Sequence, residues 1–184
     1  MKRSVDRKRR ARVLNTELFH PAPEGLPVAI RPARGSSDVL NTLERCDWNS
    51  LGKGRNGELL RAGALWLYGF LEESHSIAQG IDSPEGSYWH ALMHRSEGDF
   101  GNSKYWYRRV GRHAIFPDLL SAARQLEISS RSELAVVHEL SDWDPSRFVD
   151  AMEQAARRET EDSLLQAISR EEYNLLMGYC LAKV

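Results

Sequence analysis

The sequence predicts an all-α protein, an irregular bundle of seven to eight helices that forms a single domain over residues 36–184. Three observations favour this fold class. Apolar residues recur at intervals of three and four along most of the chain after Ser36. Capping residues, prolines and glycines separate these segments by short connections. No strand-like alternation stands out, although SELAVVHEL (residues 132–140) is apolar enough for one short strand.

The composition is that of a folded soluble protein, since 41% of the 184 residues are apolar and 28% are charged. The net charge of −1 is unevenly spread, because residues 1–12 hold seven Lys or Arg against one Asp. Residues 20–35 carry four prolines, which disfavour a helix. We therefore expect residues 1–35 to form a flexible, basic, proline-rich extension. Nucleic-acid binding is expected only through this tail.

The two cysteines, Cys46 and Cys180, lie far apart and match no metal-binding spacing. The basic N-terminus is not followed by the apolar core of a signal peptide. No run approaches the roughly 20 apolar residues that a membrane helix needs. These features predict a cytoplasmic protein with reduced thiols and no membrane contact.

The first helices are expected after the N-terminal extension. The segment SSDVLNTLERC (residues 36–46) opens with serines suited to an N-cap. LGKGRNG (residues 51–57) is expected to be a loop and lacks the spacing of a phosphate-binding loop. One long helix is predicted over residues 58–79, because apolar and small residues recur on one face. They are Leu59, Ala62, Leu65, Trp66, Gly69 and Phe70.

Four further segments have helix signals. Helices are predicted over residues 87–97 and 102–110, with Gly98 and Asp99 as the turn between them, and over residues 116–126. Asp144 is expected to cap a helix that has Pro145 at its first position. The last helix is predicted to begin at the capping-box pattern of residues 169–172.

The segment GDFGNSKYWYRRV (residues 98–110) resembles the second half of a tetratricopeptide unit, in which a Gly-Asp turn precedes an aromatic, a small and a second aromatic residue. These places are held by Gly98, Asp99, Phe100, Ser103 and Tyr107. The physical expectation is that a small residue lets two helices approach closely and that Tyr107 fills the groove. His90 and His94 depart from the pattern, and a repeat array needs about three units. The resemblance thus implies one tetratricopeptide-like hairpin.

A second resemblance covers about half of the chain. Residues 89–116, together with WDPSRFVDAMEQA (residues 143–155), resemble a bacterial family of helical proteins without an established activity. The resemblance is most specific over residues 89–111. It implies no catalytic residue, so the site has to be argued from the side chains themselves.

Two histidines of the predicted helix 87–97 suggest a metal site. His90 and His94 are four residues apart, so their imidazoles project from one helix face. Helix 58–79 should run antiparallel to this helix, which places His75 level with His90 and Glu72 level with His94. The predicted ligands are therefore His75, His90, His94 and Glu72. Such a mixed site suits a divalent metal, Zn²⁺, Fe²⁺, Mn²⁺ or Ni²⁺.

Two alternatives to a metal site stay open. The histidines can belong to a structural network in which nearby carboxylates, Tyr88 or Arg95 are their hydrogen-bond partners. They can also act in metal-free acid–base catalysis. A zincin-type protease is not expected, because Ala91 stands where that motif has its general-base glutamate.

A second candidate site is basic and aromatic. Lys104, Arg108 and Arg112 are spaced by four and share a helix face. Arginine pairs well with carboxylate or phosphate, and aromatic rings stack on planar ligands. The predicted anion- or ligand-binding residues are Arg95, Lys104, Arg108, Arg109, Arg112 and Trp106. The alternative is a solvated face neutralised by Glu97, Asp99 and Asp118.

Two functions follow from these sites. The first is a non-enzymatic helical module that binds a small anionic ligand or a protein partner through residues 87–113. The alternative is a metal-dependent enzyme whose histidine-rich site lies between two helices.

Overall fold

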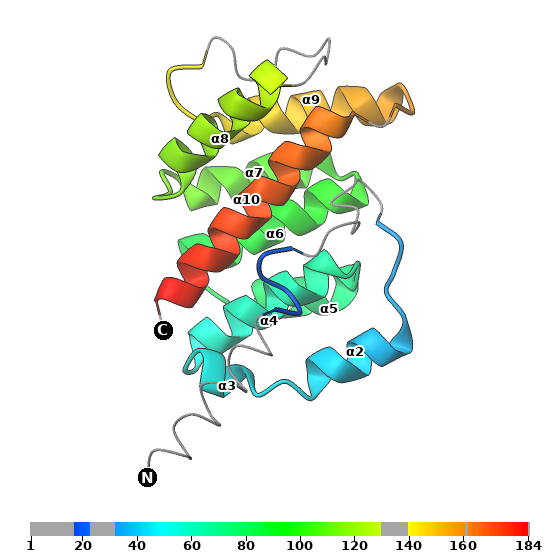
Figure 1. The fold of residues 1–184 in the computed structure, drawn as a ribbon, viewed down its shortest axis with the longest axis vertical. Coiled ribbons are helices and arrows are strands. Elements are labelled where there is room, and N and C mark those ends of the chain that lie inside the picture. The colour runs from blue at the N-terminus through cyan, green and yellow to red at the C-terminus, as the bar shows by residue number, and fades with distance from the viewer. Residues whose placement is uncertain (1–16, 23–31, 130–139, 161, 184) are drawn as a thin grey trace.

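The structure is a computed structural model that describes residues 17–22, 32–129, 140–160 and 162–183. Within these residues it has nine helices and no strand (Figure 1), so the all-α prediction is confirmed. The candidate strand at residues 132–140 lies outside the described residues except for Leu140. None of the described helices combines the length and apolar character needed to cross a membrane.

The N-terminal part of the domain is built from four helices, and two of them begin at a side-chain cap. They are α2 (Ser37–Glu44), α3 (Trp48–Leu51), α4 (Arg55–Leu67) and α5 (Leu71–Ala78). Ser36 accepts a hydrogen bond from the backbone N–H of Val39, as expected of an N-cap. Asp47 caps α3 by accepting from the N–H of Ser50.

The predicted single helix over residues 58–79 is wrong, because the chain breaks between α4 and α5. Gly69 has a φ of +74°, a left-handed conformation that glycine adopts without strain. A Cβ atom there would lie 2.4 Å from the carbonyl oxygen of Ala33. The buried hydroxyl of Ser74 then donates to the carbonyl of Ala62, which ties α5 back onto α4. The apolar spacing continues across this break and therefore hides it.

The middle of the fold is the pair α6 (Pro84–Glu97) and α7 (Phe100–Val110), which pack along each other. Gly98 ends α6 with a φ of +83°, and Asp99 caps α7 by accepting from the N–H of Asn102. The buried Ser103 hydroxyl donates to the carbonyl of Ala91 at 2.9 Å. Close approach at Ser103 and burial of Tyr107 are thus confirmed. The likeness to a tetratricopeptide unit stays a prediction.

The C-terminal part consists of α8 (Phe116–Ser129), α9 (Pro145–Arg157) and α10 (Ser163–Ala182). The cap at Asp144 is confirmed, since this side chain accepts from two backbone N–H groups of α9. Asp162 caps α10, so this helix begins earlier than predicted and Ser169 lies buried inside it. The capping-box pattern at residues 169–172 therefore does not mark a helix start.

Helix α10 runs obliquely across the other helices and joins two apolar cores (Figure 1). Its C-terminal half packs with α4 and α6, where Tyr173 and Met177 are fully buried. Its N-terminal half packs with α8 and α9, where Ile168 is fully buried. This one helix therefore holds the two ends of the bundle together.

A short piece of the predicted N-terminal extension, residues 17–22, lies on the domain. Phe19 is fully buried, and its carbonyl accepts a hydrogen bond from the hydroxyl of Tyr173. The backbone N–H of Ala22 donates to the side chain of Asn174. Most of the extension, residues 1–16 and 23–31, lies outside the described residues, so its flexibility and basic binding role stay predictions.

Candidate metal centre

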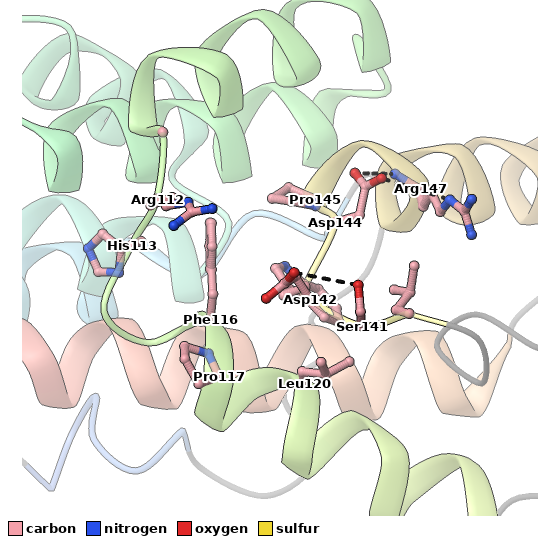
Figure 2. A pocket seen from close by; sticks show the side chains of 13 residues that line it. Arg112, His113, Phe116, Pro117, Leu120, Ser141, Asp142, Asp144, Pro145 and Arg147 are labelled. Carbon is pink, nitrogen blue, oxygen red and sulfur yellow. Dashed lines mark hydrogen bonds and ion pairs between the residues drawn. The ribbon is translucent and has the colours of Figure 1, made fainter.

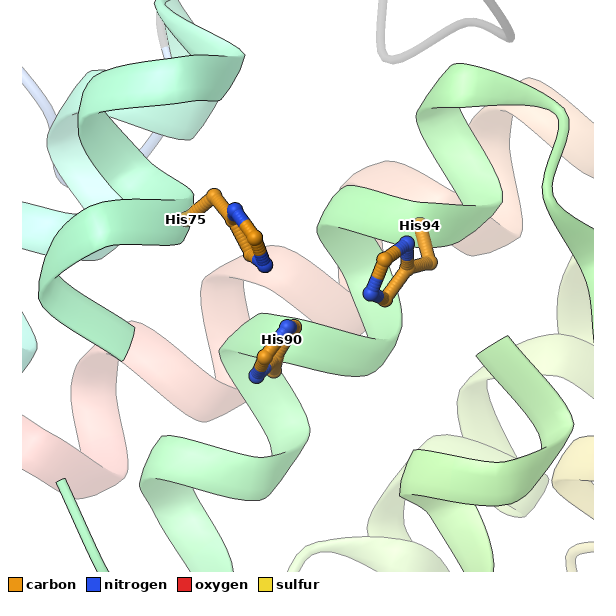
Figure 3. Close-up of side chains that lie close together, drawn as sticks. All are labelled: His75, His90 and His94. Atoms are coloured by element: carbon orange, nitrogen blue, oxygen red, sulfur yellow. The ribbon is translucent and has the colours of Figure 1, made fainter. Parts of the chain in front are cut away.

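Three histidines from two helices converge between α5 and α6, and we call them the histidine cluster (Figure 3). They are His75 of α5 with His90 and His94 of α6. The ring centres of His75 and His90 are 4.5 Å apart, those of His75 and His94 are 5.4 Å apart, and those of His90 and His94 are 4.8 Å apart. One nitrogen from each ring lies within 4.8 Å of the others. The structure thus brings together the three histidines that the sequence singles out.

Glu72 is not part of this group, and its predicted role as a fourth ligand is corrected. Among the described residues, the group of ligand atoms that lie within 4.8 Å of one another contains His75, His90 and His94 and not Glu72. Glu72 is exposed to solvent, and its charge acts on Arg34. The predicted register was counted outward from the turn between α5 and α6, and a rotation of one residue is enough to move Glu72 away from the level of His94.

Two imidazoles of the cluster, His90 and His94, contain buried nitrogens without hydrogen-bond partners among the described residues. His90 is only 3% exposed, and neither of its ring nitrogens makes a hydrogen bond. Nδ1 of His94 is also buried and lacks a hydrogen bond, although a Glu97 carboxylate oxygen lies 3.4 Å away. Buried polar atoms in folded proteins are nearly always paired. Three unpaired nitrogens in one cluster therefore need an explanation.

Burial favours the neutral form of His90 and of His94. Burial lowers the pKa of His90 to about 3, and the neighbouring His75 and His94 add to this effect. Burial also lowers the pKa of His94, while the charges of Glu97 and Asp99 oppose that shift. A neutral imidazole has a free lone pair, which is the form that a metal ion binds.

Trp106 of α7 covers one side of the cluster. Its ring stacks on His90 with ring centres 3.9 Å apart and an angle of 19°. The guanidinium of Arg109 lies 5.2 Å from the centre of the same Trp106 ring. Trp106 was predicted to stack on a planar ligand as part of the basic face. In the structure its ring instead contacts His90 and Arg109.

The spacing of the nitrogens is close to what a metal ion requires. A tetrahedral zinc with Zn–N bonds of about 2.0–2.1 Å places its ligand nitrogens about 3.3 Å apart. The cluster nitrogens lie within 4.8 Å of one another, so small rotations of the rings would bring them to that separation.

Arg95, from the opposite side of α6, belongs to a second buried cluster rather than to an exposed basic face. It is 2% exposed and forms an ion pair of 2.6 Å with Glu172 of α10, which is fully buried. The hydroxyls of Tyr88 and Tyr107 donate to the other carboxylate oxygen of Glu172, at 2.9 and 2.7 Å. Arg95 also donates to Tyr107 and Ser169. We call these five residues the arginine–glutamate network.

Every member of the arginine–glutamate network has a partner within the chain. Burial opposes the charge on Arg95, but Glu172 outweighs that effect and the pKa of Arg95 is raised. Burial raises the pKa of Tyr88 and of Tyr107 well above the usual value, so both hydroxyls stay protonated and donate. The guanidinium of Arg95 also lies 4.9 Å from the ring centre of Phe148. Arg95 is buried and already paired within the chain, so we remove it from the predicted anion-binding residues.

The remaining basic residues of α7 are partly neutralised by carboxylates that the sequence did not suggest. Lys104 pairs with Asp150 and lies 3.9 Å from Glu153, both on α9. Arg109 lies 3.8 Å from Asp82. Arg108 is exposed and lies over the ring of Tyr105. Arg112 is exposed just after the end of α7. The predicted anion-binding residues therefore do not form one continuous basic surface.

Sequence reasoning missed the residues that complete the buried network and did not find a cavity beside α8. Glu172 follows Arg95 by 77 positions, and no local spacing links the two. The cavity is lined by Arg112 and by residues of a segment before α9, including Asp142 and Trp143. Only the packing of α8 and α9 on α10 brings these side chains together. The sequence signal for this network is that Arg95 shares a helix face with apolar residues. A charged side chain on a buried face needs a counterion, here Glu172.

No family model, no curated protein and no solved structure matches this chain. The resemblance to a bacterial helical family therefore stays a prediction. Function has to be inferred from the geometry of the side chains.

Proposed function

We propose that this chain binds a divalent transition-metal ion through His75, His90 and His94. The observation that carries the proposal is the convergence of three imidazoles, whose ligand nitrogens lie within 4.8 Å of one another, around the buried and unpaired His90. Leaving one buried polar group unpaired costs about 1–3 kcal/mol, so a purely structural cluster of this kind is unfavourable. A bound metal ion would supply a partner for one buried nitrogen of His90 and would hold His94 through Nε2, which leaves Nδ1 of that ring to Glu97.

The donor set narrows the choice of metal. Three imidazoles without a carboxylate suit Zn²⁺, Fe²⁺ or Ni²⁺, whereas Mn²⁺ prefers oxygen ligands. The prediction of Mn²⁺ depended on Glu72, which lies outside the cluster. Three histidines with one position left for water are a common catalytic zinc arrangement. Zinc is therefore the first metal to test.

Glu97 supports this proposal as a positioning residue. Its carboxylate lies 3.4 Å from Nδ1 of His94, so Nε2 of that ring is left for the metal. In metal centres a histidine ligand usually directs its second nitrogen to a carboxylate or carbonyl, which fixes the ring orientation. Figure 3 shows the other nitrogen of His94 directed toward His75 and His90.

Metal binding is compatible with both functions that the sequence suggests. In a non-enzymatic module the ion would hold a ligand or a partner at its open position. In an enzyme the same position would hold water and lower the pKa of that water. Anion binding at the open position without turnover would support the first role. Turnover that requires the metal would support the second.

The test is elemental analysis of the purified, tag-free protein by plasma mass spectrometry. We expect close to one equivalent of metal in the parent protein, after zinc is added back if needed. The His90→Ala/His94→Ala variant should bind none while remaining folded by circular dichroism. His113→Gln is the matched control, because His113 is a buried histidine outside the cluster and should leave the metal content unchanged.

Absence of metal in the parent protein, even with added zinc, iron or nickel, would reject the proposal. Equal metal content in the parent and in the His90→Ala/His94→Ala variant would reject it too. Either result would return the histidine cluster to a structural role.

A further inference from the structure

A cavity of about 770 Å³ lies between α8 and the segment that leads into α9 (Figure 2). Small-molecule sites in proteins commonly enclose about 300–1,000 Å³. The cavity wall contains apolar side chains, among them Phe116, Leu120 and Leu140. The volume and the apolar lining of the cavity suit a small molecule that is largely hydrophobic.

Two opposite charges at this cavity lack strong partners. Arg112, on the connection from α7 to α8, is exposed and makes no ion pair or side-chain hydrogen bond with any described residue. Asp142, on the segment before α9, is exposed, and its contact is with the Ser141 hydroxyl at 3.5 Å. Both side chains line the cavity, yet no ion pair joins them (Figure 2).

The other two charged residues of the cavity wall are already engaged. Asp144 accepts hydrogen bonds from the N–H groups of Ser146 and Arg147 as the cap of α9. The guanidinium of Arg147 lies 3.8 Å from the carboxylate of Asp144. Arg112 and Asp142 are therefore the charged side chains of the cavity wall without a charged partner among the described residues.

We propose that this cavity binds a hydrophobic dipeptide, with the ligand carboxylate at Arg112 and its terminal ammonium at Asp142. A purely anionic ligand would meet the repulsion of Asp142, and a purely cationic ligand would meet that of Arg112. A cavity of about 770 Å³ has room for a ligand longer than a single α-amino acid. A dipeptide separates its charges and carries apolar side chains for the wall formed by Phe116 and Leu120.

The proposal concerns a site that is independent of the proposed metal centre. The histidine cluster belongs to α5 and α6, and the cavity belongs to α8 and the segments that flank it. Failure of metal binding would therefore leave this proposal intact, and the reverse also holds.

The test uses leucyl-leucine as the probe, titrated into the full-length ¹⁵N-labelled protein and followed by NMR. Trp143 lines the cavity, so its indole N–H signal reports on occupancy. Two analogues complete the set: N-acetyl-leucyl-leucine, which lacks the ammonium, and leucyl-leucine amide, which lacks the carboxylate. We expect saturable binding of leucyl-leucine and at least about tenfold weaker binding of each analogue, since a charge-assisted hydrogen bond contributes about 1.5–3 kcal/mol.

Matched variants assign each charge to its residue. Arg112→Gln should weaken leucyl-leucine binding about tenfold and leave binding of the amide unchanged. Asp142→Asn should weaken leucyl-leucine binding and leave binding of the acetylated analogue unchanged. Arg108→Gln is the control, because Arg108 lies on α7 outside the cavity and its loss should change none of the affinities.

Three results would overturn the proposal. The first is the absence of saturable shifts at probe concentrations of about 10 mM, beyond the range of even weak specific sites. The second is equal binding of leucyl-leucine and either analogue. The third is binding that neither Arg112→Gln nor Asp142→Asn alters.

Discussion

Helix α6 contributes to two polar clusters, the arginine–glutamate network and the histidine cluster. Both contain buried polar atoms, but these atoms are hydrogen-bonded in the first and unpaired in the second. Arg95 and Glu172 are held by an ion pair and by the hydroxyls of Tyr88 and Tyr107. His90, also on α6, has both ring nitrogens buried without hydrogen-bond partners among the described residues. Burial alone therefore does not distinguish a structural cluster from a binding site. The histidine cluster differs in that its unpaired nitrogens occur where three imidazoles converge.

The energetic meaning of the two clusters follows from this difference. Charge-assisted hydrogen bonds in a dry interior are stronger than those in water, so a fully paired network holds its helices in one arrangement. The arginine–glutamate network joins α6, α7 and α10 in this way. An unpaired cluster weakens the fold, and it is retained where a ligand supplies the missing contacts.

The largest effect is expected when the paired network loses one charge. Glu172→Gln leaves Arg95 as a buried cation without its counterion and should lower the free energy of unfolding by about 3–5 kcal/mol. Urea unfolding followed by circular dichroism measures this change. Glu171→Gln is the matched control, since Glu171 precedes Glu172 and makes no ion pair or side-chain hydrogen bond with a described residue. A cost below about 1 kcal/mol, which is typical of surface pairs, would show that Arg95 and Glu172 are not a structural unit.

The next effect tests whether Arg95 and Glu172 act together. In the double variant Arg95→Met/Glu172→Gln both charges are absent, so no unpaired ion remains in the core. We expect the double variant to be more stable than the sum of the single losses implies, with a coupling free energy of about 1–3 kcal/mol. A double-mutant cycle in urea measures this value. Additive losses would contradict the pairing seen in the structure.

A smaller effect concerns the pH dependence of the metal-free protein. The pKa of His90 is lowered to about 3 in the folded chain, against about 6.5 when unfolded. As the pH falls below about 6.5, His90 becomes protonated in the unfolded chain but stays neutral in the folded chain. The wild-type protein therefore loses stability relative to His90→Phe. The difference in unfolding free energy should grow by at most about 1.4 kcal/mol per pH unit. Urea unfolding at several pH values measures it, and parallel curves for the two proteins would contradict the burial of His90.

The smallest effect is a change in one pKa within the histidine cluster. Glu97 favours the charged form of His94 and raises its pKa against the effect of burial. In the metal-free protein, Glu97→Gln should therefore lower the pKa of His94 further, as followed by NMR titration of the imidazole ring. Glu171→Gln, whose carboxylate is not among those acting on His94, should leave that pKa unchanged. An unchanged pKa in Glu97→Gln would show that Glu97 does not position His94.

Local sequence signals predicted much of the fold. Gly98 and Asp99 end one helix and begin the next, and Asp144 caps α9, because these effects depend on neighbouring residues alone. The break at Gly69 was missed, since the same apolar spacing runs through both helices. The contact that requires the glycine comes from Ala33, which lies far away in the sequence.

The candidate site was predicted in part for the same reason. His90 and His94 share a face because of their spacing, and the short connection after α5 brought His75 close to them. Glu72 was placed wrongly because its position required the exact register between two helices. Glu172 was not foreseen as the partner of Arg95, since only the path of α10 brings it there.

The difference between the two clusters is tested most directly by measuring the stability of the wild-type protein and His90→Phe, each without metal and with excess zinc. Without metal at pH 7.5, we expect His90→Phe to be more stable by about 1–3 kcal/mol, because two unpaired buried nitrogens are removed. With zinc at about 100 times its dissociation constant, the wild-type protein should gain about 2.7 kcal/mol and the variant should gain nothing. A wild-type protein that zinc does not stabilise, or an equal gain in both proteins, would contradict the assignment of the histidine cluster as a metal site.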